Sequence, residues 1–152
     1  MSSGLSNHFI DKIMYSVSSW YKGTYSSDNF PKHLKPPYSI ILNLSRSNQL
    51  GSHFIAIIEK ENEIIYFDPF GLECFVQSIC KFIRCKHKKK LTNTKKIQDF
   101  NSSFCGFFAM SVSLWIEKYK SNNLNQFLQQ FSNNTKENDY ICIQLIKQII
   151  NK

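Results

Sequence analysis

The sequence predicts an α+β fold in which a small central mixed β-sheet is packed by helices. Toward both ends of the chain, apolar residues recur every three or four positions, which is the period of an amphipathic helix. The middle of the chain instead carries short runs of β-branched residues, which favour strands. Helices segregated around a central sheet are typical of the α+β class.

The first expected element is a helix over residues 7–21, where apolar side chains from Phe9 to Trp20 step by three or four positions. Residues 23–38 are rich in Gly, Ser, Asp, Asn and Pro, and this composition predicts a loop. The apolar run at residues 38–44 then predicts a buried strand.

Two β-branched runs, residues 53–60 and 63–70, flank the polar stretch KENE and predict a β-hairpin with a short turn. With the turn centred near Glu61, the antiparallel register places His53 opposite Asp68, with backbones about 5.5 Å apart. The Asp68 carboxylate can then orient the His53 imidazole. Taken alone, these two residues are equally consistent with a simple polar pair at the end of a sheet.

The second half of the chain is expected to be mainly helical. Residues 72–86 carry one apolar stripe, and a longer helix is expected to begin near Ser103. Two further helices are expected around residues 124–131 and 140–150.

Length and composition indicate one globular domain spanning residues 1–152. A chain of this size buries about 68–70% of the surface of its unfolded state, and 42% of its residues are hydrophobic. No apolar run approaches the ~20 residues of a membrane span, and the first residues lack the layout of a signal peptide. We therefore expect a monomer that acts inside a cell or a particle, without a membrane partner.

In such a compartment thiols are reduced by default, and the odd number of cysteines, without framework spacing, leaves one as a candidate reactive thiol. The cysteines are Cys74, Cys80, Cys85, Cys105 and Cys142.

Cys105 follows the small polar stretch NSSF and stands where an apolar helical pattern begins. Unpaired N–H groups and the dipole of a first helical turn stabilise a thiolate, and Gly106 leaves room for a substrate backbone. With His53 and Asp68, Cys105 completes a nucleophile, base and orienter set. Gln98 and the Cys105 N–H could form an oxyanion hole. The alternatives are a small core residue at position 105 and a surface residue at position 98.

The formal net charge of +8 is unevenly distributed, because no acidic residue lies between Glu73 and Asp99. Such a basic block either projects into solvent, serves as a nuclear-targeting signal or binds polyanions such as DNA through phosphates, without sequence preference. Its members are Lys81, Arg84, Lys86, Lys88, Lys89, Lys90, Lys95 and Lys96.

The stretches GTYSSDNFP, GSHF and YFDPFG, followed by Gln98 and NSSFCGFF, resemble adenain, the adenovirus maturation protease family. Such proteases occur in adenoviruses and in related DNA viruses, virophages and virus-like transposons. The similarity runs from about Trp20 to Trp115 and fades in the tail. The order His, acid, Gln, Cys also characterises ubiquitin-like-protein proteases. The resemblance implies their fold, in which the catalytic Cys stands at the N-terminus of a core helix.

The resemblance also implies a role for each site residue: Cys105 as nucleophile, His53 as general base, Asp68 as orienting acid and Gln98 as oxyanion donor. Two positions depart from the adenain pattern. Asp68 stands where adenovirus enzymes typically have Glu, as it does in ubiquitin-like-protein proteases. Phe54 replaces a usual Trp, which keeps an aromatic wall but loses the indole donor. The DPFG context favours the adenain side.

Adenovirus enzymes are stimulated by DNA and by a short viral peptide that is disulfide-linked to a cysteine following an arginine. Arg84 and Cys85 fall in the corresponding place, so Cys85 is a candidate for that disulfide, with a free surface thiol as the alternative. The basic block would then contact DNA. No metal is expected, because Cys74, Cys80, Cys85 and His87 lack the paired short spacing of a zinc site.

Three function classes remain. The first is a viral maturation cysteine endopeptidase that cleaves capsid and core precursor proteins next to small residues, at Gly-containing sites. Its expected location is the virion, or the host cytoplasm or nucleus where particles assemble. The second is a deconjugating protease for ubiquitin-like proteins. The third is a non-catalytic basic DNA-binding virion protein. The ordered His, Asp, Gln and Cys favour the two protease classes over the third, and the DPFG context favours the first.

Overall fold

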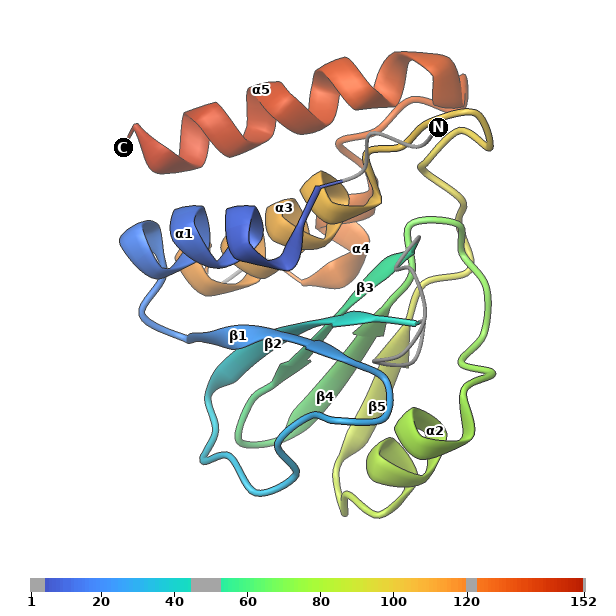
Figure 1. Cartoon of the computed structure of the whole chain (residues 1–152). Helices are drawn as coiled ribbons and strands as arrows, with labels where there is room; N and C mark the ends of the chain where they lie inside the picture. Colours follow the sequence, from blue (N-terminus) through green and yellow to red (C-terminus); the bar gives the residue numbers. More distant parts are fainter. Residues whose placement is uncertain (1–4, 45–52, 120–122, 152) are drawn as a thin grey trace.

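A computed structural model describes residues 5–44, 53–119 and 123–151 of the chain. Its centre is a five-stranded mixed sheet with the strand order β1-β2-β3-β4-β5 (Figure 1). β2, β3 and β4 pair antiparallel, whereas β1 joins β2 and β5 joins β4 in parallel. The strands are β1 Tyr21–Ser26, β2 Tyr38–Asn43, β3 Phe54–Glu59, β4 Glu63–Phe67 and β5 Lys89–Thr92.

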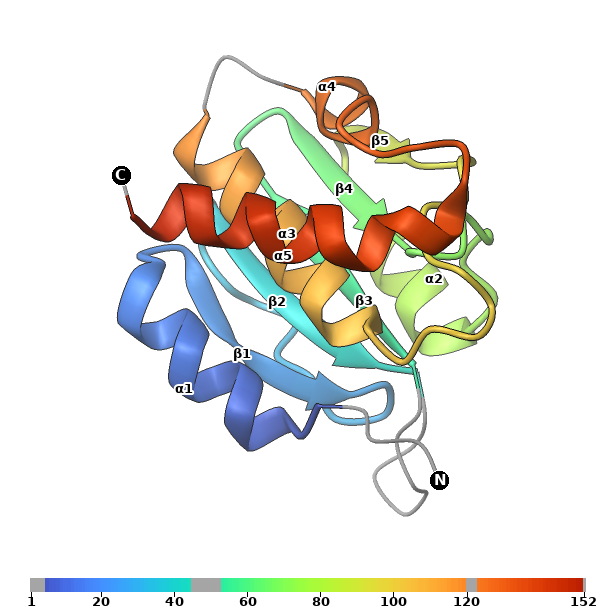
Figure 2. The same cartoon turned by 90° about the horizontal axis from the view of Figure 1, so that it is seen from above.

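Helices cover both faces of this sheet, which confirms the predicted α+β class. Figures 1 and 2 show α1, α3 and α5 stacked over one face, with α4 beside them, and α2 on the other face. Alternate side chains of the strands point to opposite faces of the sheet and belong to two separate apolar clusters, one under each helical layer. The helices are α1 Asn7–Val17, α2 Gln77–Arg84, α3 Cys105–Lys118, α4 Leu124–Leu128 and α5 Asn138–Ile150, and a 3-10 turn spans Thr135–Glu137.

α3 is the central helix of the fold. Nearly all of its side chains are buried, because it lies between β3 on one side and α5 on the other. Ser111 and Ser113 satisfy their hydroxyls on carbonyls of the same helix, those of Phe108 and Ala109, at 2.8 Å each. Because the helix is enclosed on both sides, the position of its first residue, Cys105, is fixed relative to the sheet.

The structure corrects several sequence predictions at the sheet edges. The expected loop at residues 23–38 begins within β1, whose Tyr21 and Thr24 are buried against neighbouring elements. The basic block contains the unexpected strand β5, which forms only by pairing with β4. The helices expected over residues 7–21 and 72–86 are shorter at one or both ends than their apolar stripes suggested.

No helix in the described part of the chain is both long and apolar enough to cross a membrane.

Glu59, at the end of β3, is a buried carboxylate that connects the sheet to the basic block. Tyr38 donates a hydrogen bond to it at 2.6 Å, and the ammonium groups of Lys86 and Lys88 lie 3.1 and 2.6 Å from its oxygens. Burial opposes the charged form, but the hydrogen bonds from Lys88, Tyr38 and Lys86 outweigh it and hold the pKa of Glu59 below its ordinary value. This network fixes the segment between α2 and β5 against the sheet.

We expect Glu59→Gln to lower the free energy of unfolding by about 2–4 kcal/mol, because it leaves two ammonium groups without their counter-charge. A lowered carboxylate pKa gives stability that is present above the unfolded-state pKa of about 4.5 and lost as pH falls through the folded-state value. The difference between wild type and variant in urea unfolding should therefore shrink below about pH 4.5. Glu61→Gln, at an exposed position, is the matched control, and equal losses in both variants would contradict the assignment.

Candidate active site

Three of the four catalytic candidates lie at the sheet edge where β3 begins. His53 directly precedes β3, and Asp68 directly follows β4. Because β3 and β4 are antiparallel neighbours, the beginning of one and the end of the other meet at the same edge. α3 packs on β3 and begins with Cys105. The packing of one helix on one hairpin thus assembles the three side chains.

His53 and Asp68 are in direct contact, with 2.8 Å between His53 Nε2 and Asp68 Oδ1. The hairpin register differs from the one expected, since Ala56 pairs with Phe67. Continued outward, it sets His53 opposite Phe70, not Asp68, and the two rings stack with centroids 4.8 Å apart. His53 therefore reaches Asp68 diagonally across the strand pair, while Phe70 covers the imidazole.

Asn93, which sequence reasoning missed, holds the backbone of Asp68 in place. The Asp68 N–H donates to Asn93 Oδ1 at 3.1 Å, and Asn93 Nδ2 donates back to the Asp68 carbonyl at 2.6 Å. Asn93 is buried and directly follows β5. An asparagine in a polar stretch carries no signal of this role, because the role exists only once β5 pairs with β4.

The turn after Asp68 is the second support of the carboxylate. The Phe70 N–H donates to Asp68 Oδ1 at 2.8 Å, and the Gly71 N–H donates to the Asp68 carbonyl at 2.8 Å. Gly71 has φ +73°, and an added Cβ would lie 2.7 Å from the Thr94 carbonyl oxygen. Only glycine fits this left-handed, crowded position, which gives the DPFG stretch a structural reason.

His53 also contacts Cys105, and its pKa reflects both partners. Burial lowers the pKa of an imidazole, but hydrogen bonds to Asp68 and Cys105 outweigh burial and raise the pKa of His53 from 6.5 to about 9. Because Nε2 faces Asp68, Nδ1 is the ring nitrogen left for Cys105. A protonated imidazole beside a thiol in the first turn of a helix can stabilise a thiolate.

Gln98 is buried, so the interpretation of it as a surface residue is wrong. Its Nε2 donates to the Ser102 carbonyl at 2.9 Å, and its backbone N–H donates to the Pro69 carbonyl at 3.1 Å. The first contact directs the side chain toward the segment that leads into α3, and the second ties it to the turn that follows Asp68. An amide nitrogen has two N–H groups, so one remains for an anion after the bond to Ser102.

The structure gives Gly106 a packing role in addition to the expected one. An added Cβ would meet Leu5 Cδ1 at 3.1 Å and Ile10 Cδ1 at 3.2 Å. The glycine therefore allows the start of α3 to pack closely against α1 and the residues before it, which is a reason of packing independent of any substrate.

The structure divides the basic block into two groups. Lys86 and Lys88 pair with Glu59, Lys95 donates to two carbonyls at the end of α4 and beyond it, and the Lys96 ammonium lies 3.3 Å from the ring centroid of Phe100. These four side chains have intramolecular partners. The other four are exposed on α2 and β5, and they are Lys81, Arg84, Lys89 and Lys90. Of these, Lys90 also donates to the Lys86 and Lys88 carbonyls, at 2.7 and 3.1 Å.

Cys85 is exposed and caps the C-terminus of α2, away from His53 and Cys105 in the fold. It borders a hollow of about 560 Å³ that Lys32, Lys81 and Lys86 also line. The hollow therefore carries positive charge beside a free thiol.

Comparison with known proteins adds information on the fold. No family model matches the sequence, and no curated protein matches it. The central domain of the uncharacterized Lpg1148 protein from Legionella pneumophila is 11% identical, with 96% of this chain and 97% of that chain aligned at a TM-score of 0.52. A crystal structure of the ASFV pS273R protease is 13% identical, with 93% of this chain and 67% of that chain aligned at a TM-score of 0.54.

A second crystal structure of the ASFV pS273R protease, 14% identical, aligns with 93% of this chain and 68% of that chain at a TM-score of 0.51. At such identities the similarity establishes a shared fold. The chain thus has the fold of a known protease, in agreement with the fold that the resemblance to adenain implied.

We expect the His53 imidazole to titrate near pH 9, measured by NMR on histidine-labelled protein and assigned with His53→Gln. Asp68→Asn should move the midpoint back toward 6.5, because it removes the carboxylate that favours the imidazolium. A raised histidine pKa stabilises the fold fully below about pH 6.5, and this contribution is lost as pH rises through about 9. A wild-type midpoint at or below 6.5 would contradict the described pairing.

Proposed function

We propose that this chain is a cysteine endopeptidase in which Cys105 is the nucleophile, His53 the general base, Asp68 the orienting acid and Gln98 an oxyanion donor. The observation that supports this most directly is the contact of His53 with both Asp68 and Cys105 at the first residue of a buried helix. Nucleophilic catalysis by a thiol requires such a nucleophile, base and orienter.

In this mechanism His53 holds the proton of Cys105, and the thiolate attacks the carbonyl carbon of the scissile peptide bond. The negative charge that develops on the carbonyl oxygen is received by the Cys105 N–H and by the free N–H of Gln98. His53 then gives its proton to the leaving amine. Water, deprotonated by His53, hydrolyses the thioester and restores the thiol.

We further propose that its substrates are viral capsid and core precursor proteins, cleaved next to small residues at Gly-containing sites. The motif resemblance to adenain supports this, and so does the fold shared with the ASFV pS273R protease. The proposal places the enzyme in the virion, or in the host cytoplasm or nucleus during assembly. Deconjugation of ubiquitin-like proteins remains the alternative, and the substrate decides between the two.

Cys105→Ala should abolish peptide cleavage, because the thiolate forms the covalent intermediate. The measurement is the appearance of new N-termini in a library of denatured proteins and in folded ubiquitin-like conjugates. Wild type should cut extended Gly-containing sites in the library. Cys85→Ser is the control and should retain basal cleavage, measured without an activating peptide, while both variants should unfold at nearly the wild-type temperature. Persisting cleavage by Cys105→Ala would overturn the assignment, and cleavage confined to conjugates would favour deconjugation.

Gln98→Ala should reduce turnover by about 10²–10³, the usual effect of losing one oxyanion-hole donor. The rate at which iodoacetamide alkylates Cys105 should change little, because that reaction needs the thiolate and not the hole. This pair of readouts separates a donor from a residue that only supports the local fold. Turnover within threefold of wild type would remove Gln98 from the site.

DNA and an activating peptide are proposed as partners of the same enzyme. The exposed basic residues of α2 and β5 support sequence-independent binding to phosphates. The exposed thiol of Cys85, beside a positively charged hollow, supports a peptide disulfide at that position.

Replacing Lys89 and Lys90 by Ala should make the plot of log association constant for DNA against log salt concentration less steep. The slope should fall in magnitude by about 1.8, if each lysine contacts one phosphate. Lys12→Ala with Lys147→Ala is the matched control, since it removes the same charge from exposed positions on α1 and α5. Both double variants should keep basal cleavage of a short peptide. An equal change of slope in the two would mean that the basic residues of β5 form no specific DNA contact.

A further inference from the structure

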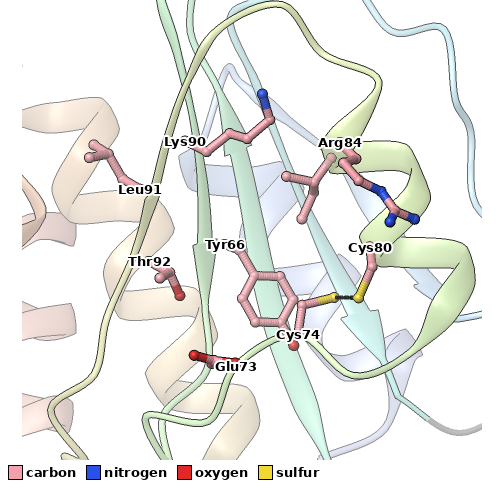
Figure 3. Close-up of a pocket in the computed structure, with 9 residues that line it drawn as sticks. Tyr66, Glu73, Cys74, Cys80, Arg84, Lys90, Leu91 and Thr92 are labelled. Carbon is pink, nitrogen blue, oxygen red and sulfur yellow. Dashed lines mark hydrogen bonds between the residues drawn. The ribbon is translucent and has the colours of Figure 1, made fainter.

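A second pair of thiols lies outside the proposed catalytic site. Cys74 belongs to the loop between β4 and α2, and Cys80 lies one turn into α2. Their sulfur atoms are 2.6 Å apart, and Figure 3 shows the two side chains pointing toward each other. This separation is shorter than a van der Waals contact between sulfur atoms and close to the covalent distance of about 2.05 Å. Little backbone movement separates the dithiol from a disulfide.

The backbone around the pair explains why the sulfurs meet. Val76 caps α2, and its carbonyl accepts hydrogen bonds from the Cys80 N–H at 3.0 Å and from Cys74 Sγ at 3.8 Å. The loop therefore turns into the helix so that Cys74 folds back over the first helical turn. This arrangement is set by the helix start and does not depend on the catalytic residues.

The pair is accessible from outside through a pocket of about 340 Å³. The Tyr66 ring lies beside Cys74 at the base of this pocket, and Arg84 and Lys90 stand on its opposite side (Figure 3). Both cysteines are partly exposed. A small reagent can therefore reach the sulfurs through this pocket.

Metal binding is a poorer explanation for these thiols. In the described residues, no group of three or more His, Cys, Asp or Glu side chains is arranged to hold a metal ion. A structural zinc site takes four ligands, and this pair supplies two.

We propose that Cys74 and Cys80 are a modification site at which a low-molecular-weight disulfide such as oxidised glutathione converts the dithiol into an intramolecular disulfide. The two residues belong to the same loop and helix start, so the second step of the exchange has its nucleophile already in place. No other cysteine is needed for the reaction.

The exchange takes place in two steps. The Cys80 thiolate attacks one sulfur of oxidised glutathione, the S–S bond of the reagent breaks, and one glutathione thiolate leaves. Cys74 then loses its proton to solvent and attacks Cys80 Sγ, which forms the protein disulfide and releases the second glutathione. Burial, together with contact to Cys80, raises the pKa of Cys74 to about 12.

The disulfide would fasten the loop after Asp68 to α2 without displacing Asp68. The carboxylate is held by contacts with His53 and with the 70–71 backbone, and its own backbone is held by Asn93. All of these contacts lie before Cys74 in the loop or on other elements. We therefore expect a gain in stability with cleavage activity unchanged within about twofold. The disulfide itself does not depend on the proposed function.

The test is tryptic mapping of the full chain after incubation with oxidised glutathione. Cleavage after Lys60 and Lys81 yields a peptide of residues 61–81 that contains Cys74 and Cys80 and no other cysteine. This peptide should lose two hydrogen atoms in mass. Cys74→Ser should instead retain one glutathionyl group on Cys80. Cys85→Ser, which removes an exposed thiol, should leave the result for residues 61–81 unchanged.

A second readout is the thermal midpoint, which oxidation should raise by about 5 °C. Reduction with dithiothreitol should reverse the shift, and the double variant Cys74→Ser, Cys80→Ser should show none. The proposal is overturned if residues 61–81 remain a dithiol or carry glutathione on both sulfurs. A thermal shift of the same size in the double variant would overturn it as well.

Discussion

The buried charge of Asp68 is the constraint on which the candidate site depends. Its side chain has no exposed surface, and an unpaired carboxylate in such a place costs several kcal/mol. His53 Nε2 and the Phe70 N–H both contact Oδ1, so this oxygen has its partners only when the hairpin ends meet and the following turn has formed. Asn93 adds β5 to the same unit. The ion pair, the turn and the sheet edge therefore stabilise one another, and α3 places Cys105 beside an imidazole that is already oriented.

The sequence predicts those parts of the fold whose signals are local. The β3–β4 hairpin and α3 are continuous apolar runs with a clear period, and they appear where expected. β1 and β5 were missed because each becomes a strand through a parallel partner supplied by another part of the chain. Three of the four residues of β5 are exposed and Leu91 is partly buried, so the segment resembles a solvated loop in sequence. The register of the hairpin differed because its turn is centred between Glu61 and Asn62, about one residue beyond the centre that the expected pairing of His53 with Asp68 required.

The same distinction applies to the site. His53, Asp68 and Cys105 could be proposed from their residue types and order, since each stands at the end of a recognisable element. Asn93 could not, because it acts through backbone atoms that reach it only in the folded sheet. The basic block is obvious in the sequence, but the contacts of its members are not. In sequence it is one run of positive charge, but Glu59 and the carbonyls beyond α4 engage part of it, and only the folded chain shows which cations face solvent.

The fold places the five thiols of this chain in four different environments. Cys142 is enclosed in the core, where burial raises its pKa to about 12, and this keeps it an inert thiol. Cys74 and Cys80 face each other, so in the proposed exchange Cys74 displaces glutathione from the mixed disulfide formed on Cys80. Cys85 is exposed but has no base like His53 described beside it. Cys105 alone among the described thiols combines a helix N-terminus with an oriented imidazole. The reactivity expected of each thiol therefore follows from its position in the fold, and the proposed disulfide would form at a site separate from Cys105, the proposed nucleophile.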